Sequence, residues 1–239
     1  KGLLNEIQEQ ARLYRVLDHG DSSPTACGWF AALRNWHIGF REYYMPNTVI
    51  SEHRKNIHAL SLGEQYAGNY ADPQIFKMAQ QSNGGFWSTA MEYSTTKLDA
   101  PPLTWNPADN NEMATRNRIN ELLRIDSSVA HPVTGEFGAP RLYFIKRTKE
   151  YPNGIFHGIT ELQSQRRKLL TTINGKAIYS DDREDSIRDH FYDVERYYVA
   201  MHGTTKALPK REIPRKSFAW YNRLSRKHVN EVLAASDIQ

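Results

Sequence analysis

Carboxylates stand at points in this sequence where a mostly apolar segment meets polar residues. Asp18 ends the segment Leu13–Asp18, Asp72 ends Tyr66–Asp72, and a third stretch, Asp189–Tyr197, holds two more aspartates. Carboxylates from distant segments form a typical site for hard divalent cations, which prefer oxygen ligands. Two such cations close together drive phosphodiester hydrolysis in many nucleases. The pattern therefore points to metal-dependent chemistry on phosphodiesters.

Asp18 and Asp72 also have ordinary structural interpretations. Asp18 is suited to begin a turn, because aspartate side chains readily form Asx-turns. Asp72 precedes Pro73, which is a natural arrangement for the N-cap and first position of a helix. Capping uses one carboxylate oxygen and leaves the other available to a metal.

The third stretch is expected to lie on a helix, with Asp189, His190 and Asp193 at positions i, i+1 and i+4. Asp189 and Asp193 then share a face, and their like charges weaken the helix slightly unless a cation offsets them. The alternative is a solvated acidic face near a helix N-terminus, which the helix dipole favours.

The first half of the chain predicts a small sheet. A tight turn between the second and third expected strands favours antiparallel pairing, and the helix before the fourth favours a parallel crossover. If the fourth strand lies beside the first, Asp18 and Asp72 sit together at the carboxyl ends, where open α/β sheets bind ligands. The expected elements are strands Leu13–Asp18, Thr25–Leu33, Trp36–Tyr44 and Tyr66–Asp72, and a helix over Thr48–Leu62.

The second half predicts further helices, one strand and a hairpin. Asn174-Gly175 between two apolar stretches is a strong signal for a tight hairpin turn. The expected elements are helices Asn110–Arg124, Ile155–Arg167 and Ser186–Met201, a loop over His131–Pro140, and a fifth strand over Arg141–Ile145.

Composition restricts the class of protein. The chain has 239 residues, 39% of them hydrophobic, and a formal net charge of +4, as expected for an ordinary soluble domain. No apolar run is long enough for a membrane span, and no signal peptide opens the chain. The lone Cys27 suits a reducing compartment. We expect residues 1–11 to be a linker or helix from an upstream domain, 12–203 the main domain, and 204–239 a basic tail.

Several common catalytic motifs are absent from the sequence. It has no HExxH and no paired cysteines, so it gives no case for a zinc site. It has no GxSxG nucleophile motif and no GxxxxGK[ST] phosphate-binding loop. We therefore expect no ATPase in this chain.

The order of the segments resembles the nuclease domain of the large terminase subunit of tailed bacteriophages, a member of the ribonuclease H-like superfamily. No single motif carries the resemblance; the ordered set does, from about Leu13 to Met201. Its members are Arg15–Asp18, Ser23–Ala26, Arg41–Tyr44, Thr48–His53, Tyr70–Pro73, His131–Glu136, Ala139–Tyr143 and Asp189–Tyr197.

The resemblance implies a fold and a catalytic site. The fold is α/β, a mixed sheet with antiparallel strands 1-2-3, a parallel strand 4 beside strand 1, and helices on both faces. The catalytic and metal-binding residues are Asp18, Asp72 and Asp193, with His190 and Asp189 as further metal ligands. The site would hold two Mg²⁺ or Mn²⁺ ions.

The resemblance also implies a biological setting. The family cuts concatemeric viral DNA during genome packaging, in the host cell cytoplasm. Its partners are double-stranded DNA, the portal protein, the small terminase subunit and the terminase ATPase domain. Contacts to the DNA backbone are expected from the basic residues Arg116, Arg118, Arg166, Arg167, Lys210, Arg211, Arg215 and Lys216.

Three rival hypotheses remain open on the sequence. Another ribonuclease H-like enzyme, such as a junction resolvase or transposase, would use the same carboxylates on branched DNA or transposon ends. A non-catalytic DNA-binding or portal-docking module would keep the fold without a working site. A glycosidase also uses two carboxylates, but the basic balance of the chain favours phosphate over sugar.

Overall fold

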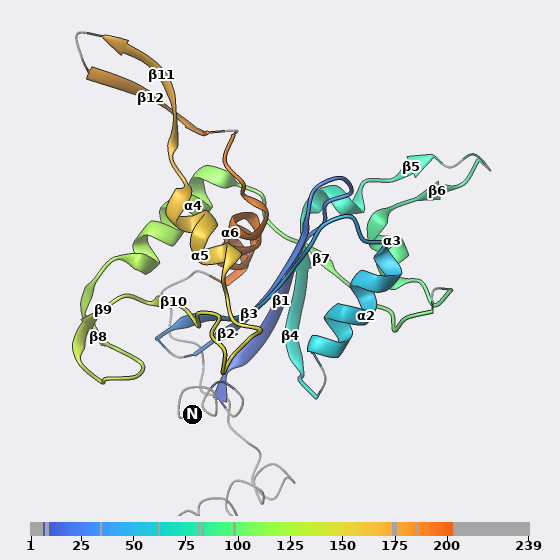
Figure 1. The fold of residues 1–239 in the computed structure, drawn as a ribbon, viewed down its shortest axis with the longest axis horizontal. Helices are drawn as coiled ribbons and strands as arrows, with labels where there is room; N and C mark the ends of the chain where they lie inside the picture. Colours follow the sequence, from blue (N-terminus) through green and yellow to red (C-terminus); the bar gives the residue numbers. More distant parts are fainter. Residues whose placement is uncertain are drawn as a thin grey trace, which may run out of the picture. The chain divides into compact units, whose positions relative to one another are not determined.

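The structure of the chain, a computed structural model, describes residues 7, 10–33, 35–61, 63–80, 82, 84–97, 99–173, 176–184 and 186–202. These residues form one mixed sheet with helices on both faces, together with three two-stranded ribbons (Figure 1). The elements in chain order are β1 (Arg12–Asp18), β2 (Thr25–Ala32), β3 (His37–Met45), α2 (Ile50–Leu60), β4 (Tyr66–Ala71), η1 (Pro73–Phe76), β5 (Ala79–Gln80), β6 (Phe86–Trp87), α3 (Thr89–Ser94), β7 (Asn106–Pro107), α4 (Glu112–Leu123), β8 (Asp126–Ala130), β9 (Phe137–Ala139), β10 (Leu142–Phe144), α5 (His157–Ser164), β11 (Arg167–Ile173), β12 (Lys176–Arg183) and α6 (His190–His202).

The strand order in the sheet confirms the predicted fold class. The order is β10-β3-β2-β1-β4-β7. Strands β1, β2 and β3 are antiparallel neighbours, and β4 returns after α2 to pair parallel with β1. Helices α2 and α3 cover one face of the sheet, and α4, α5 and α6 cover the other (Figure 1). This is the arrangement expected for a ribonuclease H-like sheet.

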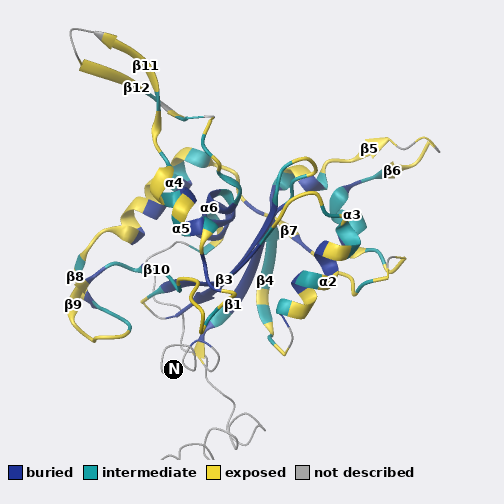
Figure 2. Ribbon diagram, viewed as in Figure 1, coloured by how far each residue is buried: buried dark blue, intermediate teal, exposed yellow. Residues whose placement is uncertain are grey.

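Side chains of β1 alternate between the two faces. Leu13 and Leu17 belong to the core on the side of α2 and α3, whereas Tyr14 packs near Tyr198 of α6 with ring centroids 6.1 Å apart. Because successive side chains of a strand point to opposite faces, Asp18 belongs with Tyr14 to the face that α6 covers. The strand is buried over almost its whole length (Figure 2).

Helix α6 lies close to the sheet at Gly28 of β2. A Cβ at this position would lie 2.8 Å from Cγ1 of Val194 and 3.0 Å from Cζ of Phe191, both on α6. Two residues further, Phe30 stacks on Tyr198 with ring centroids 4.2 Å apart. The missing side chain at Gly28 therefore sets how closely α6 approaches the sheet.

Two helix boundaries differ from the prediction by three residues or more. The helix expected over Ile155–Arg167 ends at Ser164, and the backbone is extended from Gln165, whose side-chain amide donates to the carbonyl of Glu161. Arg167 therefore opens β11 instead of closing a helix. The helix expected from Ser186 begins at His190.

The predicted hairpin is present as β11 and β12, and both strands are longer than predicted. Most of its surface is exposed (Figure 2), and its turn, Asn174-Gly175, lies outside the described residues. The loop expected over His131–Pro140 contains β9, which pairs with β8. The predicted linker 1–11, apart from residues 7, 10 and 11, and the predicted tail 204–239 also lie outside the described residues, so these domain limits stay predictions. Among the residues that are described, no helix has the length and apolar character needed to cross a membrane.

We expect Gly28→Ala to destabilise the protein by pushing α6 away from β2. Overpacking a buried site by one methyl group costs about 1–3 kcal/mol of unfolding free energy. Urea unfolding measures the loss, and hydrogen exchange of the α6 amides should become faster.

Gly39→Ala is the matched control, because its Cβ would lie 2.8 Å from Phe144 of β10, away from α6. It should lower stability without a selective increase of exchange in α6. Equal exchange of α6 in both variants would contradict the role assigned to Gly28.

Candidate functional site

Asp18 and Asp72 lie together at one edge of the sheet. Leu17 and Ala71, the residues that precede them, are partners in the parallel pair β1–β4. The backbone N–H of Asp72 donates to the carbonyl of Leu17 over 3.0 Å. The adjacency predicted from the crossover is therefore present, and both residues are buried at the carboxyl ends of their strands.

Asp72 also acts as the predicted N-cap. One of its carboxylate oxygens accepts from the backbone N–H of Gln74 over 2.9 Å, at the start of η1, and Pro73 occupies the first helical position. The cap uses Oδ1, so the structural interpretation and a ligand role through the other oxygen are compatible.

Helix α6 brings a histidine to the same edge. Nδ1 of His190 lies 3.6 Å from Oδ2 of Asp18. The nearby carboxylate of Asp18 raises the pKa of His190, and burial opposes this shift. The first turn of α6 thus places the imidazole of His190 beside the carboxylate at the end of β1.

Negative charge from two neighbours acts on Asp18. Burial, followed by the charges of Asp193 and Asp72, raises the pKa of Asp18 to about 6, although the nearby His190 opposes the shift. Burial and the charges of Asp193, Asp72 and Asp18 also raise the pKa of Tyr197. Asp72, which follows β4, and Asp193 of α6 therefore both disfavour the charged form of Asp18 at the end of β1.

Two arginines form ion pairs with Asp189 and Asp193. Arg183, the last residue of β12, approaches Asp189 over 2.6 Å and Asp193 over 2.8 Å. Arg196, one turn further along α6, donates to Asp193 over 2.9 Å. The like charges of Asp189 and Asp193 are therefore offset by guanidinium groups.

Asp189 does not lie inside the helix as predicted. It precedes α6, and its carbonyl accepts from the backbone N–H of Asp193 over 2.7 Å. Burial and the charge of Asp193 raise the pKa of Asp189, while Arg183 opposes the shift. Both carboxylates contact Arg183, and the bond from the Asp193 N–H to the Asp189 carbonyl keeps the i, i+4 spacing of a helical turn.

The donor set suits a hard divalent cation, but its present arrangement does not enclose one. Carboxylate oxygens with one imidazole are suitable ligands for Mg²⁺ or Mn²⁺, and the raised pKa of Asp18 reports a place where added positive charge is favourable. Within the described ranges, no three His, Cys, Asp or Glu side chains are placed so that they could hold an ion. Arg183 and Arg196 both contact Oδ1 of Asp193 instead.

The first turn of α6 is capped by a glutamate that the sequence prediction missed. Glu161 of α5 is buried, and its Oε2 accepts from the backbone N–H of Phe191 over 2.7 Å and of Tyr192 over 3.0 Å. Its other oxygen accepts from the hydroxyl of Tyr44 over 3.0 Å. A charged acceptor at a helix N-terminus satisfies N–H groups that have no partner within the helix.

A second buried glutamate, Glu42, caps the N-terminus of α5. Glu42 of β3 accepts from the backbone N–H groups of Phe156 and Gly158, each over 3.0 Å, and contacts Nδ1 of His157 over 2.7 Å. Nearby Glu195 is fully buried, and burial raises its pKa well above the usual range. The charged form of Glu195 is therefore disfavoured by burial and by its neighbours Glu161 and Glu42.

The predicted DNA-contacting residues fall into three groups. Arg116 on α4, Arg166 after α5 and Arg167 on β11 line one hollow, which also includes Arg183. Arg118 on α4 donates to the carbonyl of Ala200 over 3.0 Å and so ties α4 to α6. The remaining four, Lys210, Arg211, Arg215 and Lys216, lie outside the described residues.

Comparison with known proteins gives structural neighbours only. No protein-family model matches the chain, and no curated protein matches its sequence. The g2p large terminase nuclease domain of bacteriophage SPP1, solved with bound Mn, has a TM-score of 0.48 at 14% identity, over 82% of this chain and 89% of that one. The P22 large terminase nuclease domain has a TM-score of 0.46 at 13% identity, over 81% and 82%.

A large terminase from the thermophilic bacteriophage D6E has a TM-score of 0.47 at 12% identity and covers 81% of this chain. This chain spans 39% of the length of that protein. At these identities the similarity concerns the fold alone.

We expect Asp18→Asn to stabilise the metal-free protein at neutral pH. The folded pKa of Asp18, about 6, exceeds its unfolded value of 3.8, so the folded state holds the proton more tightly between these values. Stability of the wild type therefore falls as pH rises from about 4 to 6 and stays lower above. An asparagine does not ionise, so the variant avoids this loss of unfolding free energy, which amounts to at most about 3 kcal/mol.

Urea unfolding in EDTA at pH 4.5 and pH 8 measures this difference. The exposed Asp99→Asn is the control and should change little at either pH. A gain for Asp18→Asn that does not grow with pH would contradict the convergence of charge on Asp18.

We expect Glu161→Gln to loosen the start of α6. The neutral amide replaces a charged acceptor of two backbone N–H groups, and hydrogen bonds to charged groups contribute about 1.5–3 kcal/mol. Urea unfolding measures the loss, and exchange of the Phe191 and Tyr192 amides should accelerate. The exposed Glu121→Gln on α4 should do neither; if both variants behave alike, Glu161 is not the cap that holds α6.

Proposed function

We propose that this chain is a metal-dependent DNA endonuclease that cleaves concatemeric viral DNA during packaging of a tailed bacteriophage genome. The observation that carries the proposal is the placement of Asp72 beside Asp18 at the ends of paired strands, with His190 of α6 3.6 Å from Asp18. The charge of Asp193, on the same helix, also acts on Asp18. Close carboxylates are unfavourable without a cation, and such a set is suited to phosphodiester hydrolysis. The ordered sequence segments that resemble terminase nuclease domains specify the biological setting.

Asp18, Asp72 and Asp193 are proposed to hold two Mg²⁺ or Mn²⁺ ions. When bound, the ions would activate a water molecule and stabilise the departing oxygen. Asp193 becomes available when Arg183 turns away from it, while Arg196 keeps the carboxylate aligned on α6. Asp189 and His190 are proposed as further ligands, His190 from its position beside Asp18.

Substrate binding is assigned to basic side chains around this edge. Arg116, Arg166 and Arg167 contact the phosphate backbone, which fixes the position of the duplex and carries little sequence information. This suits an enzyme with weak sequence preference. The proposed partners are double-stranded DNA, the portal protein, the small terminase subunit and the terminase ATPase domain, and the proposed location is the host cell cytoplasm.

Cleavage of supercoiled plasmid tests the proposal. We expect the wild type to nick and linearise plasmid in Mn²⁺ or Mg²⁺ and to be inactive in EDTA. Asp18→Asn and Asp193→Asn should each reduce the rate by about 100-fold or more, since even the outer partners of metal ligands are worth 10–100-fold.

Asp99→Asn is the control and should cut at the wild-type rate. Cleavage that Asp18→Asn and Asp193→Asn leave unchanged would contradict the assigned site. A folded protein that cuts in neither metal would favour a docking or DNA-binding module over an enzyme.

A further inference from the structure

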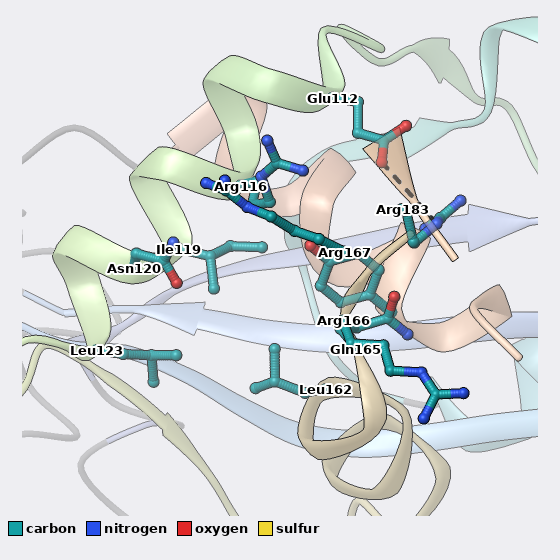
Figure 3. A pocket seen from close by; sticks show the side chains of 11 residues that line it. Glu112, Arg116, Ile119, Asn120, Leu123, Leu162, Gln165, Arg166, Arg167 and Arg183 are labelled. Carbon is teal, nitrogen blue, oxygen red and sulfur yellow. Dashed lines mark ion pairs between the residues drawn. The ribbon is translucent and has the colours of Figure 1, made fainter. Parts of the chain in front are cut away.

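A basic hollow lies between α4, the end of α5 and the base of the β11–β12 hairpin. Its volume is about 270 Å³. Arginines from three separate segments point around it: Arg116 from α4, Arg166 and Arg167 from the start of the hairpin, and Arg183 from its end (Figure 3). Tyr192 of α6 also lines it. Segments distant in sequence thus line one hollow with arginine side chains.

The charge around the hollow is strongly positive. Four arginines line it against a single carboxylate, Glu112, whose oxygen lies 3.9 Å from Arg183. Guanidinium is the side-chain group best suited to phosphate, because its planar fork donates two parallel hydrogen bonds.

Arg183 connects this hollow to the candidate catalytic edge. It lines the hollow and also contacts Asp189 and Asp193, over 2.6 and 2.8 Å. A phosphate bound in the hollow would therefore contact the same arginine that contacts both carboxylates. It would also compete with Asp193 for Arg183.

The size and exposure of the hollow limit what fits. A volume of about 270 Å³ falls just below the range of pockets that enclose a whole small ligand, about 300–1,000 Å³. Arg166 and Arg167 are exposed to solvent, so a chain can pass over them. A single backbone phosphate with its sugar, within a longer strand, meets both conditions.

We propose that the hollow binds a backbone phosphate of the DNA, next to the bond that is cut, and that this phosphate draws Arg183 away from Asp193. The inference rests on the proposed function and adds to it one defined subsite. DNA binding would then free a carboxylate for the metal. Metal and DNA would consequently bind with positive coupling, which is reciprocal by linkage.

Binding of a fluorescein-labelled 20-base-pair duplex in EDTA, followed by anisotropy, tests the subsite without cleavage. The double variant Arg116→Gln/Arg167→Gln should raise Kd roughly tenfold at about 100 mM salt. The slope of log Kd against log salt should fall by about 0.9 for each lost phosphate contact. Arg124→Gln, on the same helix but outside the hollow and paired with Glu121, should leave both values unchanged.

Equal binding by the double variant and Arg124→Gln would overturn the subsite. Inorganic phosphate at matched ionic strength is the second probe. If it weakens duplex binding by the wild type and not by the double variant at about 1 mM, the hollow takes free phosphate, and the assignment to DNA is wrong.

The coupling is tested by Mn²⁺ titration, followed by electron paramagnetic resonance, with and without the duplex. The duplex should tighten Mn²⁺ binding severalfold in the wild type and much less in the double variant. The same gain in both would overturn the coupling.

Plasmid cleavage keeps this inference separate from the proposed function. At saturating Mn²⁺, where the coupling to metal binding no longer limits the rate, the double variant should raise KM severalfold and change kcat less than KM. Cleavage with an unchanged KM overturns the subsite and leaves the nuclease intact. If the wild type cuts no plasmid, the proposed nuclease function is wrong. The binding assay in EDTA still decides whether the hollow binds DNA.

Discussion

The position of α6 depends on one buried carboxylate. Glu161 accepts the first free N–H groups of α6, and α5, which carries Glu161, is itself capped by Glu42 of β3. A rigid strand thus fixes one helix, and that helix fixes the next. These two caps therefore position His190 and Asp193 relative to the end of β1. Hydrogen bonds to charged acceptors are among the stronger ones available, which suits a site where small displacements of a ligand matter.

The site combines acidic groups that repel with arginines that compensate them. Burial and neighbouring carboxylates raise the pKa of Asp18 to about 6, and Arg183 and Arg196 neutralise Asp193. Removing one member of a buried charged set is costly because it leaves the other unpaired. Arg183 differs from Arg196 in belonging to an exposed hairpin, not to α6, so it is the partner that can leave without unfolding the helix.

Local patterns in the sequence predict much of the fold and, within the site, the adjacency of Asp18 and Asp72. The tight turn after β2 predicted the antiparallel pair β2–β3, and the helix before β4 predicted a parallel crossover. The adjacency of Asp18 and Asp72 follows once β4 lies beside β1, which the resemblance implied. The roles of Arg183 and Glu161 could not be predicted, because their partners lie on other elements, Glu161 with α6 thirty residues on. The α5 boundary was wrong for a similar reason, since the chain is extended from Gln165 and enters β11, whose partner strand β12 lies further along the chain.

A crystal structure of the intact chain soaked in Mn²⁺, with anomalous scattering to locate the metal, tests the central claim most directly. We predict Mn²⁺ bound by Asp18, Asp72 and Asp193, with Arg183 withdrawn from Asp193 and α6 in place. Mn²⁺ absent from this edge at millimolar concentration, or bound elsewhere with the Arg183–Asp193 pair intact, would contradict the account.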